Sequence, residues 1–132
     1  MSKHVLLVDD NKAVRKFLRS YLESEPGIEI CGEACDGNDA VDKALTLAPD
    51  LVVMDLSMPQ MNGLEASRKL KEKMPALPIV LFTSHTSVLT DFDAASAGIN
   101  AIVSKSGSLE SLKSQVVTLL ATTKRSIAKG AR

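Results

Sequence analysis

Residues 52–63 read VVMDLSMPQMNG, and this stretch decides the fold. A run of aliphatic residues ends on one acid, Asp55, and a polar segment with proline, asparagine and glycine follows. A strand-length apolar run without polar alternation is typical of a strand buried on both faces of a parallel sheet. An acid at the end of such a strand is costly to bury unless another group pairs with it. The rest of the chain is therefore expected to supply a partner for Asp55.

Four other segments share the length and the β-branched or aliphatic composition of this strand. The five predicted strands are therefore residues 4–8, 28–34, 51–54, 79–82 and 101–104. The segment at 28–34 differs because Glu29 and Glu33 interrupt its apolar residues, as suits a strand at the edge of a sheet.

Helical patterns lie between the predicted strands. The clearest is an apolar stripe with i, i+3, i+4, i+7, i+8 spacing, formed by Val14, Phe17, Leu18, Tyr21 and Leu22. Further helices are predicted at about residues 38–47, 63–74, 86–97 and 109–121. Because strands and helices alternate, and because crossovers between parallel strands are right-handed, the predicted fold class is doubly wound α/β.

The composition is that of one globular domain: 132 residues, of which 45% are hydrophobic and 24% charged. No apolar run approaches the length that spans a bilayer, and the N-terminus lacks the features of a secretory signal. We therefore expect a cytoplasmic protein with no membrane partner. Cys31 and Cys35 are spaced C-x-x-x-C, which fits neither a redox motif nor half of a zinc site, so we predict buried free thiols.

Basic and acidic residues are equal in number but are unevenly distributed. Four of the sixteen basic residues lie in the last nine positions, so residues 1–123 hold twelve basic residues against sixteen acidic ones. An acidic body is a poor surface for nucleic acids, whose phosphates bind clustered positive charge. We expect no direct nucleic-acid binding by this body.

Polar residues follow four of the predicted strands, at the edge where open α/β sheets bind ligands. They are Asp9, Asp10, Asn11, Asp55, Thr83, Ser84 and Lys105. Crowded acids repel one another unless a cation joins them, and a few carboxylates with open positions suit Mg²⁺ better than a full calcium cage. Lys105 and Thr83 would complete a clamp for a phosphoryl group, which a carboxylate nucleophile can accept.

Each of these residues also has an ordinary structural interpretation. Asp10 or Asn11 would cap the first helix. Thr83 or Ser84 would cap the fourth, and Lys105 would be an exposed surface lysine. Their joint appearance at four matched strand ends favours a shared site over these separate interpretations.

Four motifs, taken with their order and spacing, resemble the receiver domain of bacterial two-component response regulators: LLVDDN, VVMDLSMPQMNG, IVLFTS and AIVSKS. The resemblance covers about residues 3–120. It implies a flavodoxin-like (βα)5 fold with strand order 2-1-3-4-5, in which residues 1–123 form the receiver domain and 124–132 a basic, frayed C-terminal tail. The motifs are most similar to receivers that usually precede a LuxR-type output domain, so we expect either a stand-alone receiver or a fragment of a longer regulator.

The resemblance implies that a sensor histidine kinase or a phosphotransfer protein phosphorylates Asp55. Mg²⁺ would be held by the carboxylates of Asp10 and Asp55 and by the backbone carbonyl of Ser57, with Asp9 acting mainly through water. Ser57 and His85 flank the path of a hydrolytic water in such domains. His85 would then help to set the phosphate lifetime, or it would be a loop residue without a role.

The resemblance also implies how the signal leaves the domain. Thr83 would be the switch hydroxyl, Lys105 the ion-pair partner of the phosphate, and residues 86–121 the output surface. That surface would act on a downstream protein, on a DNA-binding output domain, or through a phosphorylation-dependent homodimer. Ile102 stands where many receivers carry an aromatic switch residue, so the coupling to the output is expected to differ.

Two other functions are less well supported by the residues. Haloacid-dehalogenase-type phosphatases also use an aspartate nucleophile, but they need a second acid two residues later, where this chain has Ser57. A receiver-like interaction domain that has lost phosphorylation is disfavoured by the intact set of acids, hydroxyl and lysine. The predicted function is a signalling switch that slowly removes its own phosphate, and not a turnover enzyme.

Overall fold

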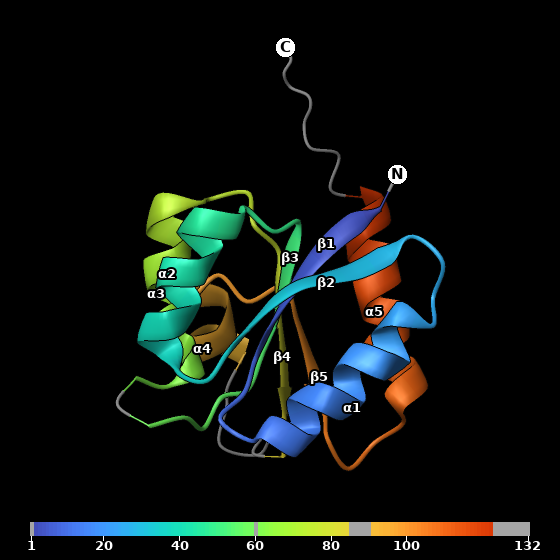
Figure 1. The fold of residues 1–132 in the computed structure, drawn as a ribbon. Helices are drawn as coiled ribbons and strands as arrows, with labels where there is room; N and C mark the ends of the chain where they lie inside the picture. Colours follow the sequence, from blue (N-terminus) through green and yellow to red (C-terminus); the bar gives the residue numbers. More distant parts are fainter. Residues whose placement is uncertain (1, 60, 85–90, 123–132) are drawn as a thin grey trace.

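The computed structural model describes residues 2–59, 61–84 and 91–122, which alternate strand and helix along the chain (Figure 1). The elements are β1 (Lys3–Val8), α1 (Lys12–Glu23), β2 (Ile28–Ala34), α2 (Gly37–Leu47), β3 (Leu51–Met54), α3 (Gly63–Lys73), β4 (Ile79–Thr83), α4 (Asp91–Ser96), β5 (Ala101–Ser104) and α5 (Leu109–Thr122). All five predicted strands are present, with ends within one residue of the prediction. The predicted α/β alternation is therefore confirmed.

The strands form one parallel sheet with the order β2-β1-β3-β4-β5, as predicted. Val8 of β1 pairs in register with Met54 of β3, and the N–H of Asp55 donates to the carbonyl oxygen of Val8 at 3.0 Å. The residues that follow these two strands, Asp9 and Asp55, therefore leave the sheet side by side. In doubly wound sheets the strand order reverses between these two strands, which is where ligands bind.

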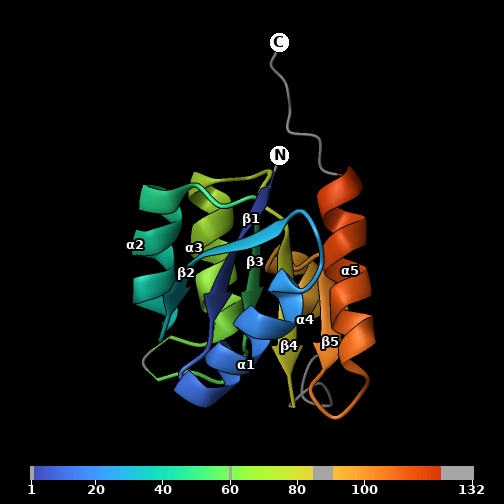
Figure 2. The same cartoon turned by 45° about the vertical axis from the view of Figure 1, so that its right-hand side comes forward.

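Each face of the sheet has its own apolar core. α1 and α5 cover one face, and α2 and α3 cover the other (Figure 1 and Figure 2). Successive residues of β1 alternate between the cores: Val5 and Leu7 pack with α1 and α5, whereas Leu6 and Val8 pack with α2 and α3. Burial on both faces explains the lack of polar alternation, and each fully buried leucine contributes about 1.5–3 kcal/mol.

One member of the predicted apolar stripe of α1 does not join the core. Phe17 is 55% exposed, and its ring stacks on Tyr21 with the centroids 6.5 Å apart. Leu18 and Leu22 are buried as predicted. Phe17 lies about 100° round the helix from Leu18, at the margin of the stripe that packs on the sheet.

The cysteines, the fourth helix and the C-terminal tail were also predicted from the sequence. Both cysteines are free, but the prediction that both are buried is wrong, because Cys31 is half-buried and Cys35, just beyond the end of β2, is exposed. The fourth predicted helix is present as α4, while its expected first residues, 86–90, and the tail at 123–132 lie outside the described residues. In the described ranges, no helix is both long and apolar enough to cross a membrane.

Gly63 begins α3 at a point where the helix touches the backbone of Asp55. The Gly63 N–H donates to the Leu56 carbonyl oxygen at 2.7 Å, and a Cβ on Gly63 would lie 2.5 Å from the Asp55 carbonyl oxygen. Asn62 caps the helix, and Glu65 completes a capping box with it. The start of α3 is thereby fixed against the strand end that carries Asp55.

We expect Gly63→Ala to lower the free energy of unfolding by about 1–3 kcal/mol, because the added methyl group must displace the backbone of Asp55. Gly107→Ala is a matched control, since a Cβ there would lie 3.5 Å from its nearest neighbour, the Ser104 carbonyl oxygen. Urea unfolding followed by circular dichroism measures both variants. Equal stability of the two variants would contradict the close approach at Gly63.

Candidate functional site

The carboxyl ends of β1 and β3 bring three acids together. Carboxylate oxygens of Asp9, Asp10 and Asp55 lie within 4.8 Å of one another. Asp9 and Asp55 are buried, with 3% and 7% of their surface exposed, whereas Asp10 is exposed. Two buried carboxylates at this separation repel each other unless positive charge lies close to both.

Lys105 supplies that charge from the end of β5. Its ammonium nitrogen lies 2.9 Å from Asp9 Oδ2 and 3.4 Å from Asp55 Oδ2. Burial lowers the pKa of Lys105, but the hydrogen bond to Asp9 and the charges of Asp9 and Asp55 outweigh it, so the pKa lies above its usual value. Lys105 is therefore an ammonium at neutral pH, and it is the partner that the position of Asp55 demands.

Every polar atom of Asp9 forms a hydrogen bond. Its N–H donates to the Ala34 carbonyl oxygen at 3.0 Å, and its Oδ1 accepts from the Asn11 N–H at 2.9 Å. Its Oδ2 accepts from Lys105, and its carbonyl oxygen accepts from Arg15 Nη1 at 2.6 Å. The Asp9 carboxylate is thus committed to holding Lys105 and the turn at Asn11.

Asp55 differs from Asp9 because one of its oxygens lacks a partner. Within the part of the chain that the structure describes, Asp55 Oδ1 is buried and forms no hydrogen bond. A buried acceptor left unpaired costs about 1–3 kcal/mol, so it marks a place for a ligand. A divalent cation fits there, because three carboxylates converge and such sets suit Mg²⁺. Ser57, whose carbonyl was predicted to join them, is exposed in the loop after β3.

Thr83 ends β4, the strand that lies between β3, which leads to Asp55, and β5, which leads to Lys105. It is fully buried and pairs in register with Ser104, and its carbonyl oxygen accepts from the Lys105 N–H at 3.0 Å. Ser84, the next residue, is exposed. His85 lies outside the described residues.

For three residues the structure decides between membership of a shared site and an ordinary structural role. Asn11 caps α1, because its side chain accepts from the Val14 N–H at 3.1 Å, so the capping interpretation is correct for Asn11 and wrong for Asp10. Lys105 is paired with two buried acids, and its side chain is 22% exposed, so its interpretation as a surface lysine is wrong.

Two arginines of α1, Arg15 and Arg19, form an ion group beside Asp9 that was not predicted from the sequence. Arg15 Nε donates to Glu33 Oε1 and Arg19 Nε donates to Glu33 Oε2, both at 2.9 Å. Burial raises the pKa of Glu33, but the hydrogen bonds and charges of the two arginines outweigh this, so the pKa lies below its usual value. The available signal was Glu33, an acid near the end of a predicted strand, together with two arginines four residues apart on the preceding predicted helix.

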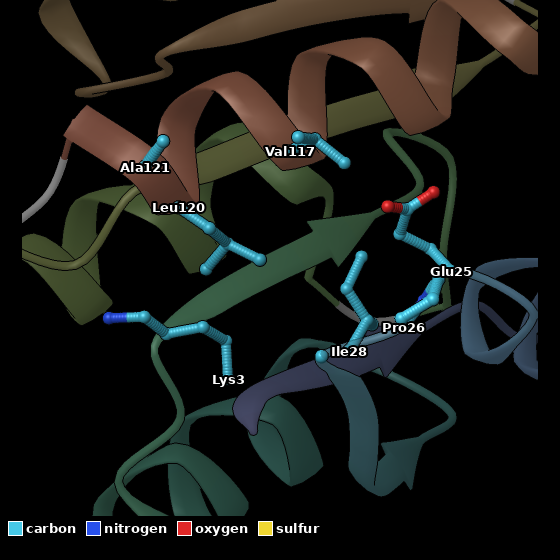
Figure 3. A pocket seen from close by; sticks show the side chains of 8 residues that line it. Lys3, Glu25, Pro26, Ile28, Val117, Leu120 and Ala121 are labelled. Atoms are coloured by element: carbon cyan, nitrogen blue, oxygen red, sulfur yellow. The ribbon is translucent and has the colours of Figure 1, made fainter. Parts of the chain in front are cut away.

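A pocket lies at the amino ends of the strands, away from the acids (Figure 3). It is lined by Lys3 and Ile28, at the starts of β1 and β2, and by Val117 and Leu120 near the end of α5. The acids lie at the opposite, carboxyl ends of the strands. This pocket is therefore not part of the site.

Comparisons with known proteins identify one family. The model of the response regulator receiver domain matches residues 5–117. A protein-glutamate methylesterase/protein-glutamine glutaminase of Alkalilimnicola ehrlichii is 37% identical over a match that covers 88% of this chain and 31% of that protein. The chain spans from about a third to just over half of the length of the first curated relatives that it matches.

Two solved structures match nearly the whole chain. A LuxR-family two-component response regulator from Aurantimonas sp. SI85-9A1 matches with a TM-score of 0.87 and 33% identity, over 92% of this chain and 86% of that chain. The response regulator TrrA of Thermotoga maritima, in complex with Mg²⁺-BeF, matches with a TM-score of 0.81 and 32% identity, over 89% of this chain and 98% of that chain.

We expect Lys105→Met to lower the free energy of unfolding by roughly 3 kcal/mol at pH 7, because it leaves Asp9 and Asp55 buried without a cation. Lys113→Met is the control: its side chain is similarly exposed, but its contacts are with Glu25 at 3.9 Å, Ser24 Oγ at 3.2 Å and the Tyr21 ring and not with two buried acids, so a loss of about 1 kcal/mol is expected. Urea unfolding without divalent ions measures the difference. Equal losses in the two variants would contradict the role of Lys105 as the cation of the site.

Proposed function

The chain belongs to the response regulator receiver domain family, and we propose that Asp55 is the residue that accepts the phosphoryl group. The observation that carries the proposal is the asymmetry of Asp55, whose Oδ2 faces Lys105 while Oδ1 is buried and, among the described residues, unpaired. Asp9 has both carboxylate oxygens engaged, and Asp10 is exposed. Asp55 is therefore the buried acid whose carboxylate is not fully engaged, so one oxygen can bind Mg²⁺ while the other accepts the phosphoryl group beside Lys105.

Transfer to Asp55 forms a bond between a carboxylate oxygen and phosphorus. The bond that breaks is the phosphorus–nitrogen bond of a phosphohistidine donor, whose imidazole leaves with the electron pair and is protonated by solvent. Lys105, close to Asp55 Oδ2, offsets the negative charge that the incoming phosphoryl oxygens bring. The burial of Asp55 limits the access of water to the acyl phosphate.

The carboxylates of Asp10 and Asp55 and the backbone carbonyl of Ser57 would hold Mg²⁺, with Asp9 acting through water. Bound there, the ion supplies positive charge to the phosphoryl oxygens. Two observations support this assignment: the three acids converge, and Asp55 Oδ1 is a buried acceptor with no partner among the described residues. The similar TrrA structure contains Mg²⁺-BeF, which agrees with the choice of ion.

Thr83 is the proposed switch hydroxyl. It is buried next to Lys105, and its strand, β4, pairs with β5 on the way to α5. A phosphoryl group on Asp55 would attract the hydroxyl of Thr83 and so bias the packing of α4, β5 and α5. Ile102, 37% exposed on β5, would contribute an aliphatic surface where many receivers have an aromatic ring.

The proposed donor is a sensor histidine kinase or a phosphotransfer protein. The signal would pass to a downstream protein, to a DNA-binding output domain, or to a second copy of the chain, and the similarity to a LuxR-family regulator supports the second route. A turnover enzyme is less well supported, because the methylesterase relative is matched over 31% of its length and Ser57 occupies the place of a second acid. We therefore propose a switch.

Incubation with acetyl phosphate and Mg²⁺ is expected to add one phosphoryl group, which peptide mass spectrometry will assign to Asp55. Asp55→Asn keeps the side-chain shape but removes the nucleophile, so it is expected to abolish the added mass. Asp42→Asn, which changes an exposed acid of α2, is expected to retain it. Labelling that persists in Asp55→Asn would contradict the proposal, and rapid phosphate release over many cycles would favour a turnover enzyme.

Thr83→Val preserves the shape of the side chain and removes its hydroxyl. We expect this variant to accept the phosphoryl group on Asp55 but to lose most of the change in amide NMR shifts that phosphorylation causes in β5 and α5. Thr83→Ser keeps a hydroxyl and is expected to retain most of the change. If Thr83→Val responds as strongly as the wild type, Thr83 is not the switch residue.

A further inference from the structure

We propose that Arg15 is a positioning residue for the Mg²⁺ site, because it fixes the peptide group that joins Asp9 to Asp10. The inference rests on the proposed function, since it concerns the same set of acids. Arg15 is not itself a ligand, because its guanidinium binds the backbone carbonyl oxygen of Asp9. It acts by setting where the carboxylate of Asp10 points.

The contacts of Arg15 lock its guanidinium in one orientation. Nε donates to Glu33 Oε1 at 2.9 Å, and Nη1 donates to the Asp9 carbonyl oxygen at 2.6 Å. Because the guanidinium is planar and its donors form a rigid fork, fixing Nε also fixes the direction of Nη1. Glu33 is held in turn by Arg19, and the side chain of Arg15 is only 14% exposed. The fork therefore joins β2 to the end of β1.

The Asp9 carbonyl matters because of peptide planarity. The carbonyl oxygen of Asp9, its carbon and the nitrogen and Cα of Asp10 lie in one plane, so holding the oxygen restricts the position of Asp10. The rest of Asp9 is already fixed by its bonds to Ala34, Asn11 and Lys105. Because Asp10 is exposed, the direction of its carboxylate toward Asp55 depends mainly on the position of its backbone.

Positioning and simple electrostatics predict opposite effects on metal binding. If Arg15 acted only through its charge, its removal would make the site more negative and would strengthen Mg²⁺ binding. If Arg15 positions Asp10, its removal weakens binding even though the local negative charge increases. Arg19 gives the electrostatic baseline, because it carries the same charge, lies on the same helix and binds the same Glu33, but its side chain donates to Glu33 and not to Asp9.

The test is calorimetric titration of Mg²⁺ into the wild-type chain and into the variants Arg15→Met, Arg15→Lys and Arg19→Met at pH 7. We expect Arg15→Met to weaken Mg²⁺ binding by about tenfold, the effect seen when a residue supporting a metal ligand is lost. Arg15→Lys keeps the charge but cannot serve both acceptors with a rigid fork, so it is also expected to weaken binding. Arg19→Met is expected to bind Mg²⁺ as tightly as the wild type or more tightly.

A second measurement follows phosphorylation of Asp55 by acetyl phosphate as Mg²⁺ is raised. Arg15→Met is expected to require about tenfold more Mg²⁺ and then to reach the wild-type level, because its acceptor and its lysine are intact. Urea unfolding without Mg²⁺ checks the fold, and Arg15→Met is expected to lose more stability than Arg19→Met, because it also loses the hydrogen bond to the Asp9 carbonyl oxygen. If Arg15→Met does not fold, Arg15→Lys decides the question.

Two outcomes separate the failure of this inference from the failure of the proposed function. A wild-type chain that binds Mg²⁺ and is phosphorylated on Asp55, with Arg15 variants that bind Mg²⁺ no more weakly than Arg19→Met, would overturn the role of Arg15 alone. A wild-type chain that neither binds Mg²⁺ nor accepts the phosphoryl group would overturn both.

Discussion

The buried contact of Lys105 with Asp9 and Asp55 is the constraint on which the rest of the structure depends. Lys105 and Asp9 are 96 positions apart in the chain, and the lysine reaches from the end of β5 past the ends of β4 and β3. The parallel sheet makes this contact possible, because its strands end at one edge. Burying the two acids is costly without the lysine, so the ion group stabilises the fold that brings it together.

The same contact gives a route for the signal if Asp55 is phosphorylated as proposed. A phosphoryl group on Asp55 would change the charge that Lys105 balances, and the N–H of Lys105 donates to the carbonyl oxygen of Thr83. Lys105 directly follows β5 and is bonded to Thr83, the last residue of β4. A change in charge at Asp55 can therefore act on both strands through Lys105. The remaining neighbours are fixed: Gly63 packs α3 against the backbone of Asp55, and Arg15 ties the end of β1 to β2.

The sequence was sufficient for the strands and for the edge that carries the site. Runs such as residues 51–54 lack polar alternation because both faces are buried, and strand ends meet at one edge in any parallel sheet. The role of Arg15 was not predictable, because it depends on how α1 lies across β2. The exposure of Phe17 and Cys35 likewise depends on where the packed surface ends, which local patterns do not encode.

The most direct test of the account is a crystal structure of the chain with Mg²⁺ and beryllofluoride, which mimics a phosphoryl group. We expect beryllofluoride on Asp55, with Lys105 and the hydroxyl of Thr83 facing the fluorine atoms. We also expect Mg²⁺ in contact with the carboxylates of Asp10 and Asp55 and with the carbonyl oxygen of Ser57. Binding of the ion elsewhere, or Lys105 turned away from Asp55, would contradict the proposed site.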